Sequence, residues 1–298
     1  MPYSKSGYQM TLEDRGPDDR IVNVASVPQR SPFRYPGGKT WLVPRVRQWL
    51  PSFRHKPSLL VEPFAGGAIV GLTAVFEDLA EHVMLVELDE GVAAVWESIL
   101  NGDSGWLADR ILTFNVTEEN VRVELSQPTQ SLRDIAFQTI LKNRTFHGGI
   151  LAPGSNVIKF GENGKGIRSR WYPQTLAKRI QDIASICHRI TFVRGDGMAV
   201  ISEHASMPTA AFFIDPPYTA AGKKAGTRMY TYHTLDHKRL FDITAQLAGD
   251  FLMTYDNASE VSELAIRHGF QVRTVSMKNT HHASMTELLI GKDLGWLR

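Results

Sequence analysis

The sequence predicts an α/β fold in which a mostly parallel sheet carries helices on both faces. The run Ala210–Ile214 is apolar without alternation, as expected of a strand that is covered on both faces. The apolar runs Leu59–Val61 and Val83–Val86 flank a helical pattern over Ile69–Leu79, which forms a strand–helix–strand unit. A chain of 298 residues, 43% hydrophobic and 21% charged, can bury a core of the size that such a fold needs.

Composition narrows the classes of protein to consider. No stretch of eighteen apolar residues occurs, and the first residues lack the apolar core of a signal peptide, so we expect a cytoplasmic protein without a membrane segment. The single cysteine, Cys187, excludes an intramolecular disulfide and fits a reducing compartment. A net charge of +2 says little about nucleic acid. Residues 1 to 30 are polar and aperiodic, which predicts a mobile arm.

The first stretch that can bind a ligand lies between residues 31 and 42. Tyr35 is followed by Pro36 and the run Gly37-Gly38-Lys39, after which apolar residues recur with helical spacing up to Leu50. Backbone amides at a helix start, exposed by glycine and joined by a lysine, form a seat for a carboxylate or a phosphate. On these residues alone, a glycine turn before an amphipathic helix with a solvated lysine is the alternative.

The strand Leu59–Glu62 runs into a glycine turn that contains Phe64 and Gly66. Glu87 ends the next strand, twenty-one residues beyond Gly66, which places its carboxylate where it can accept hydrogen bonds from ribose hydroxyls. The fuller glycine pattern of a nicotinamide dinucleotide site is absent. A turn that serves only packing in a doubly wound sheet is the alternative.

Between residues 101 and 189 the strand–helix rhythm lapses, and Leu132–Leu141 and Thr175–His188 predict helices of an inserted subdomain. From residue 141 to residue 190, nine basic side chains stand against two acidic ones. Such an excess, interleaved with aromatic and amide side chains, suits a phosphate backbone, and a solvated basic face is the alternative. The candidate nucleic-acid contacts are Lys142, Asn143, Arg144, Lys159, Lys165, Arg168 and Arg170.

The strand Ala210–Ile214 stops at Asp215-Pro216-Pro217-Tyr218, because two prolines remove two backbone donors. Open α/β sheets bind ligands at this edge. The Asp215 carboxylate and the Pro216 carbonyl offer two acceptors, and Tyr218 offers a flat face for stacking. Two acceptors beside an aromatic ring fit a planar amine.

Several further features lie in the remainder of the chain. A strand from residue 189 ends at Asp196 between two glycines, and the basic loop 220–228, with Lys223 and Lys224, is suited to closing over a nucleotide. Asp236 is predicted to cap a helix. Strands are predicted over 251–257, 271–277 and 285–290, the last two as a hairpin. The ten histidines show no metal-binding spacing, so we expect no metal.

These stretches resemble, in order, the motifs of the Dam-type, class alpha DNA N6-adenine methyltransferases. The resemblance covers residues 31 to 297, and motifs X, I, II, III and IV correspond to Tyr35–Lys39, Glu62–Gly66, Glu87–Asp89, Asp196 and Asp215–Tyr218. Two departures are visible. Ala68 stands where the family has a glycine, which predicts a slightly shifted loop. The target-recognition signature, here Lys142–Gly149, is shortened, which leaves the recognised bases open.

The resemblance implies a Rossmann-like S-adenosylmethionine-dependent methyltransferase sheet, mostly parallel with an antiparallel closing hairpin, and an inserted helical subdomain. It implies a catalytic domain over 31–100 and 190–298, a target-recognition insertion over 101–189 and an N-terminal arm over 1–30. The implied catalytic residues are Asp215, Pro216 and Tyr218. The implied cofactor-binding residues are Tyr35, Gly38, Lys39, Glu62, Phe64, Gly66, Glu87, Asp196 and Asp215. Lys223 and Lys224 join the insertion's cations as DNA contacts.

The implied reaction is methyl transfer from S-adenosylmethionine to N6 of an adenine rotated out of double-stranded DNA. The sequence leaves the oligomeric state open, with a monomer favoured, and does not say whether the enzyme acts alone or in a restriction–modification pair. Two alternatives stay open. The substrate can be RNA or another amine, because Asp-Pro-Pro-Tyr does not encode the sugar. The chain can also be a binding protein that has kept the fold and lost turnover.

Overall fold

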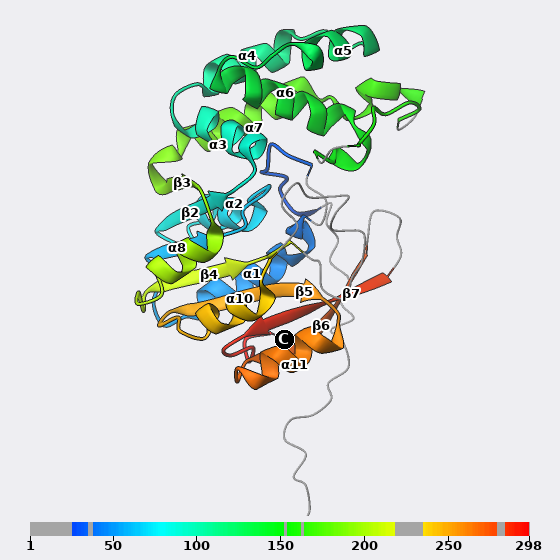
Figure 1. Ribbon diagram of the computed structural model, residues 1–298. Helices are drawn as coiled ribbons and strands as arrows, with labels where there is room; N and C mark the ends of the chain where they lie inside the picture. Colours follow the sequence, from blue (N-terminus) through cyan, green and yellow to red (C-terminus); the bar gives the residue numbers. More distant parts are fainter. Residues whose placement is uncertain are drawn as a thin grey trace, which may run out of the picture.

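The computed structural model describes residues 26–34, 38–151, 154–161, 164–217, 235–278 and 284–297. Its centre is a seven-stranded sheet with the order β3-β2-β1-β4-β5-β7-β6 (Figure 1). The strands are β1 (Leu59–Glu62), β2 (His82–Glu87), β3 (Ile190–Arg194), β4 (Ala210–Ile214), β5 (Asp250–Asp256), β6 (Gln271–Lys278) and β7 (Ser284–Gly291).

The first five strands pair in parallel, and β7 pairs antiparallel with both β5 and β6. This arrangement confirms the predicted mostly parallel sheet with an antiparallel closing hairpin. The central strands β1 and β4 are buried along their whole length, as their unbroken apolar runs require. The carboxyl ends of β1 to β5 therefore meet at one edge of the sheet, and the predicted site residues follow these ends.

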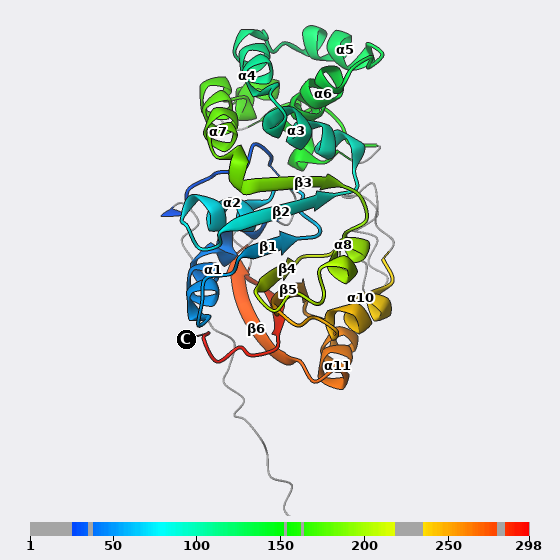
Figure 2. The ribbon, with the colours of Figure 1, turned by 90° about the vertical axis from the view of Figure 1, so that its left-hand side faces the viewer.

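Helices cover both faces of the sheet (Figure 2). On one side lie α1 (Val43–Trp49) and α2 (Ile69–Phe76), and on the other lie α8 (Gly197–Glu203), α10 (His237–Thr244) and α11 (Ser259–Arg267). The core is divided accordingly, because one cluster of buried side chains includes α1 and α2 and a second includes α8, α10 and α11. Asp236 accepts a hydrogen bond from the Arg239 amide at 2.9 Å, which confirms the predicted helix cap.

A helical layer lies beyond the β3 edge of the sheet (Figures 1 and 2). It contains α3 (Glu90–Leu100), α4 (Ser104–Thr113), α5 (Glu118–Ser126), α6 (Leu132–Thr145) and α7 (Pro173–Ser185). Most of it corresponds to the predicted insertion, and α3 adds one helix that precedes the predicted boundary because it packs on α6. The buried side chains of this layer belong to the same core cluster as α1 and α2, so the layer shares its core with that face of the sheet.

Five residues of the predicted N-terminal arm, 26–30, belong to the described part of the chain and contact the core. Val27 is buried in the core, and Arg30 donates to Glu77 at 3.0 Å. Residues 1–25 lie outside the described residues. Within the described residues, the structure contains no helix with the length and apolarity that crossing a membrane requires.

Candidate active site

Asp215 stands directly after β4, at the carboxyl edge of the sheet. Two side chains from other elements converge on its Oδ1 atom. The Thr254 hydroxyl, on β5, donates to it at 2.7 Å, and the Lys39 ammonium lies 3.1 Å away. Asp215 itself stays 22% exposed at its side chain, whereas Thr254 is fully buried. The carboxylate is therefore held in one orientation and still reaches the surface, as a group that must meet a substrate should.

The side chain of Lys39 is buried, with 2% of its surface exposed. It lies in the short helix Lys39–Leu42 that precedes α1, and its ammonium is also 3.3 Å from a carboxylate oxygen of Glu287 on β7. The sequence predicted Gly38 and Lys39 as a seat for an external carboxylate or phosphate. In the structure Gly38 is exposed, and the Lys39 ammonium contacts two carboxylates of the protein itself.

Glu287 is a member of this cluster that the sequence reasoning missed, as is Thr254. Burial raises the pKa of Glu287 to about 7; Lys39 opposes this shift, and the nearby Asp215 adds to it. A usable signal was present in the sequence. Glu287 immediately precedes Leu288, Leu289 and Ile290 in a strand that must pack against the core, and a carboxylate inside such a run needs a buried partner.

The glycine turn after β1 is built around two buried carboxyl groups. Glu62, 3% exposed, accepts a hydrogen bond from the Gly71 amide at 2.7 Å. Burial raises the pKa of Glu62 to about 8, and the Gly71 hydrogen bond limits the shift. A Cβ on Gly71 would lie 2.6 Å from a Glu62 carboxylate oxygen, so the absence of a side chain there lets α2 sit against β1. Glu62 thus links the end of β1 to α2 through a buried hydrogen bond and so fixes the turn between them.

Gly66, in the same turn, has φ +47° and both of its backbone groups are used. Its amide donates to Glu87 Oε2 at 2.9 Å, and its carbonyl accepts from the Trp96 indole at 3.0 Å. The other oxygen of Glu87 accepts from the amides of Leu88 and Asp89. Burial raises the pKa of Glu87 to about 7, while these backbone donors lower it. Glu87 ends β2 as predicted, and it ties the ends of β1 and β2 together.

Ala68 occupies the position where the resemblance predicted a shifted loop. Its φ of +51° and ψ of +35° lie in the left-handed region that glycine favours. The alanine therefore adopts a backbone conformation that glycine would adopt at a lower cost. It does so as the first residue before α2, and it is 1% exposed.

The end of β3 packs tightly against the same turn. Asp196 is exposed and accepts from the Met198 amide at 2.9 Å, which caps α8. A Cβ on Gly197 would lie 2.0 Å from the Pro63 carbonyl oxygen, so only glycine fits between α8 and the turn. Phe64 beside it is half-buried. The ends of β1, β2 and β3 thus bring Phe64, Gly66, Glu87 and Asp196 to one edge of the sheet, and their role in binding a cofactor stays a prediction.

Two predicted nucleic-acid contacts in the helical layer are buried. Asn143 accepts from the Arg34 amide at 2.9 Å and donates to the carbonyls of Arg34 and Gly149. Arg144, 4% exposed, donates to the Pro32 carbonyl. The expectation that these two side chains face DNA is corrected by their burial: they hold the segment that leads to Lys39 against α6. A count of basic residues in the sequence could not predict this burial, because the count does not show which side of a helix faces the core.

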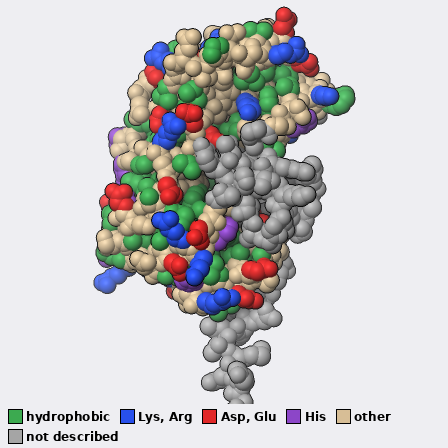
Figure 3. Space-filling model, in the orientation of Figure 1, with side chains coloured by type: hydrophobic (Ala, Val, Ile, Leu, Met, Phe, Trp, Pro, Cys, Tyr) green, Lys and Arg blue, Asp and Glu red, His purple; other side chains and the backbone are tan. Residues whose placement is uncertain are grey.

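The other predicted cations differ in exposure. Lys142 donates to the Leu151 carbonyl at 2.8 Å, and the Arg168 guanidinium donates to the Val116 carbonyl at 2.6 Å. Arg170 is half-buried, whereas Lys159 and Lys165 are exposed. On the face drawn in Figure 3, the cations of the helical layer are scattered singly and form no continuous patch. Tyr35, Tyr218, Lys223 and Lys224 lie outside the described residues.

Phe160 was not predicted as a functional residue, yet its side chain is 84% exposed next to Lys159. It follows an antiparallel bridge between Phe146 and Val157. The signal in the sequence is an aromatic residue directly after Lys159, in a glycine-rich stretch that also contains Lys165.

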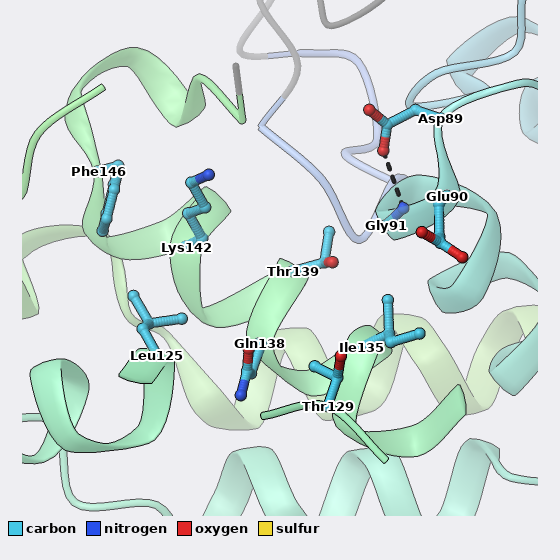
Figure 4. A pocket seen from close by; sticks show the side chains of 10 residues that line it. All are labelled: Asp89, Glu90, Gly91, Leu125, Thr129, Ile135, Gln138, Thr139, Lys142 and Phe146. Atoms are coloured by element: carbon cyan, nitrogen blue, oxygen red, sulfur yellow. Dashed lines mark hydrogen bonds between the residues drawn. The ribbon is translucent and has the colours of Figure 1, made fainter. Parts of the chain in front are cut away.

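A cavity of about 540 Å³ opens between α3, α5 and α6 (Figure 4). It begins at Asp89, which accepts from the Gly91 amide at 2.9 Å, and so adjoins the end of β2. Its walls combine carboxylates, an ammonium and apolar side chains: Asp89, Glu90, Gly91, Leu125, Thr129, Ile135, Gln138, Thr139, Lys142 and Phe146. Among the residues that the structure describes, no group of acidic, histidine or cysteine side chains could hold a metal ion.

Comparison with known proteins gives a family match and one curated relative. Residues 35–138 match the model of the D12 class N6 adenine-specific DNA methyltransferases. A protein of Escherichia phage P1 described as a DNA N-6-adenine-methyltransferase is 26% identical over 278 residues, which are 87% of this chain and 35% of the relative. This chain therefore spans about a third of that relative's length.

Solved structures show weaker likeness. A putative RNA methyltransferase of Pyrococcus horikoshii aligns with a TM-score of 0.40 and 11% identity, covering 90% of this chain and 92% of that one. A putative methyltransferase of Escherichia coli aligns with a TM-score of 0.39 and 11% identity, covering 85% and 86%. The part of the chain that carries Lys39, Glu62, Gly66 and Glu87 is thus similar in sequence to the D12 class of N6 adenine-specific DNA methyltransferases.

Proposed function

We propose that this chain transfers a methyl group from S-adenosylmethionine to N6 of adenine in double-stranded DNA. One observation carries the proposal: Asp215 is held by Lys39 and Thr254 at the end of β4, next to the glycine turn at the end of β1. Asp215, which can accept hydrogen bonds from an amine, and the glycine turn, which can bind a nucleoside, thus lie at the same edge of the sheet. The family match, which covers the turn and Lys39, and the similarity to the phage P1 enzyme support the same reaction.

The residues at the ends of β1, β2 and β3 suit the cofactor. The Glu87 carboxylate can accept hydrogen bonds from ribose hydroxyls, because it lies at the end of a strand. The exposed Leu88 beside it offers an apolar face to a ring of the ligand. Gly66 brings backbone close to a ligand without a side chain in the way. Phe64 and the exposed Asp196 complete this edge. When bound, S-adenosylmethionine supplies an electrophilic methyl group on a sulfonium.

Asp215 supplies the catalytic interaction. The amino group of adenine is a poor nucleophile because its lone pair is delocalised into the ring. When the Asp215 carboxylate and the Pro216 carbonyl each accept one N–H, the nitrogen is drawn toward tetrahedral geometry and its lone pair turns to the methyl group. This interaction strengthens along the reaction, so it lowers the barrier rather than only binding substrate. Tyr218 would stack on the base and hold it in line.

The DNA surface is proposed at Lys159, Phe160 and Lys165 in the helical layer. These side chains are exposed, so the lysines can neutralise phosphates and the phenyl ring can stack on a base. Arg168 lies close by in sequence and is also exposed. To reach N6, the target adenine has to leave the duplex, which would bring it to the edge that Asp215 shares with the glycine turn.

Transfer of a radioactive methyl group from S-adenosylmethionine tests the proposal. We expect label in duplex DNA, and N6-methyladenine after enzymatic digestion of that DNA to nucleosides. Matched single-stranded RNA of the same sequence serves as the second substrate. Label in RNA alone would favour the alternative reaction, and tight DNA binding with no label in either substrate would favour a binding protein without turnover.

A further inference from the structure

Three charged side chains, two of them buried, link Asp215 at the edge of the sheet to β7. The Lys39 ammonium lies 3.1 Å from Asp215 Oδ1 and 3.3 Å from Glu287 Oε2. Lys39 and Glu287 are 2% and 6% exposed at their side chains. The three residues come from distant parts of the chain, so their meeting is a property of the fold. One ammonium therefore faces two carboxylates, of which Glu287 is buried with it and Asp215 reaches the surface.

We propose that Glu287 is a positioning residue that acts through Lys39 to set how strongly Asp215 accepts hydrogen bonds from the substrate amine. This inference rests on the proposed function, because the amine is the substrate of that reaction. Glu287 does not contact the substrate in this scheme. It contacts the Lys39 ammonium, which in turn contacts Asp215.

The single positive charge of Lys39 acts on both carboxylates. When Glu287 is ionised, its negative charge offsets part of the positive potential that Lys39 produces at Asp215. Asp215 therefore keeps a strong negative potential for the incoming N–H groups. When Glu287 carries a proton, the full charge of Lys39 acts on Asp215 and weakens it as an acceptor. At low local dielectric this difference is larger than it would be in water. Thr254 fixes the same oxygen in both states, so the change is in charge rather than in place.

The groups that face Glu287 determine the direction of its response to pH. They are Lys39, Asp215 and Asp256, which lies opposite Glu287 in the register of β5 and β7. On its other side β6 presents the uncharged Val275. Burial raises the pKa of Glu287 to about 7, with Asp215 and Asp256 adding to the rise and Lys39 opposing it. The ionised form, which strengthens Asp215, therefore becomes the major form as the pH rises through neutrality.

The test compares wild type with Glu287→Gln, which keeps the shape and removes the titration. Single-turnover methyl transfer is measured with saturating S-adenosylmethionine and duplex DNA. For wild type we expect the rate to rise about tenfold between about pH 6 and pH 8. For Glu287→Gln we expect the low rate at every pH, with S-adenosylmethionine affinity and the thermal unfolding midpoint close to wild type. A rate and a pH profile equal to wild type would overturn the proposal.

Asp256→Asn is the matched variant. It removes a negative charge from the strand beside Glu287 and so lowers the pKa of Glu287. We expect the step in the profile to move to lower pH, with the same plateau. A structural role for Glu287 would predict a different result: loss of cofactor affinity and of thermal stability in Glu287→Gln, and no shifted step in Asp256→Asn. That pattern would reject the inference.

A second readout does not need activity. The carboxyl carbon of Asp215, assigned in a carbon-13 NMR spectrum by comparison with Asp215→Asn, should shift with a midpoint near pH 7 in wild type and lose that step in Glu287→Gln. If wild type transfers no methyl group but this step is present, the proposed function fails while the link from Glu287 to Asp215 stands. If the step is absent from wild type, the link is wrong.

Discussion

The edge of the sheet and the helical layer both contain charged residues that the sequence marked as functional, and the structure treats them differently. At the edge, Glu87, Asp196 and Asp215 all follow strand ends and lie where they were predicted. In the helical layer, Asn143 and Arg144 of α6 turn inward, whereas Lys159 and Lys165, in the segment between α6 and α7, are exposed. A parallel sheet fixes where its strands end, whereas the orientation of a helix depends on what it packs against.

At the carboxyl edge of the sheet, we expect Asp215→Ala to have the largest effect on the reaction. Loss of the acceptor should lower single-turnover methyl transfer by about a thousandfold. Affinity for S-adenosylmethionine, measured by equilibrium binding, should stay within a few-fold, because the glycine turn is held by Glu62 and Glu87. Wild-type transfer by this variant would remove Asp215 from the chemistry.

Gly197→Ala tests how closely that edge is packed. The new Cβ would lie 2.0 Å from the Pro63 carbonyl oxygen, so the turn after β1 must move, at a cost of about 3 kcal/mol or more in unfolding free energy. Gly195→Ala is the control, because its Cβ would meet nothing nearer than Val193 at 3.7 Å. Urea unfolding of both variants measures the difference. Equal stability of the two would mean that the contact with Pro63 is not restrictive.

Asn143→Ala, set against Lys159→Ala, sharpens the contrast between the inward face of α6 and the exposed segment between α6 and α7. The first change leaves three backbone groups without their buried partner and should cost about 3 kcal/mol of stability. The second should change stability by less than about 0.5 kcal/mol and reduce the slope of DNA affinity against salt by about one phosphate contact. A Lys159→Ala variant with an unchanged salt slope would take this residue out of the DNA surface.

The raised pKa of Glu62 predicts how stability depends on pH. The folded state binds this proton more tightly than the unfolded state, because the pKa rises from 4.5 to about 8. Stability from Glu62 is therefore greatest at low pH and declines as the pH rises between these two values. We expect Glu62→Gln to flatten that decline in urea unfolding measured from pH 5 to pH 8. A decline of the same steepness in the variant would assign it to other groups.

How much the sequence could predict follows from the same contrast. The sheet, its closing hairpin and the strand-end acids could be predicted, because unbroken apolar runs and strand spacing determine them locally. The partnership of Lys39 with Glu287 could not, because it joins residues far apart in the chain through the β5–β7 pairing. The inward turn of Arg144 could not either, since a basic residue on a helix has the same sequence signal whether it meets a phosphate or the Pro32 carbonyl.

Ala68→Gly should have the smallest effect, and it tests whether the edge tolerates the alanine because of its surroundings. The left-handed conformation costs alanine about 1–2 kcal/mol, which glycine would recover. Glycine would lose a similar amount through its freer unfolded chain and the missing buried methyl group. We therefore expect a change in unfolding free energy within about 1 kcal/mol. Ala93→Gly, at a buried position inside α3, has no strain to relieve and should cost about 2 kcal/mol. If both variants lost the same stability, the conformation of Ala68 would carry no strain, and the glycine of the family's pattern would have no conformational advantage at this turn.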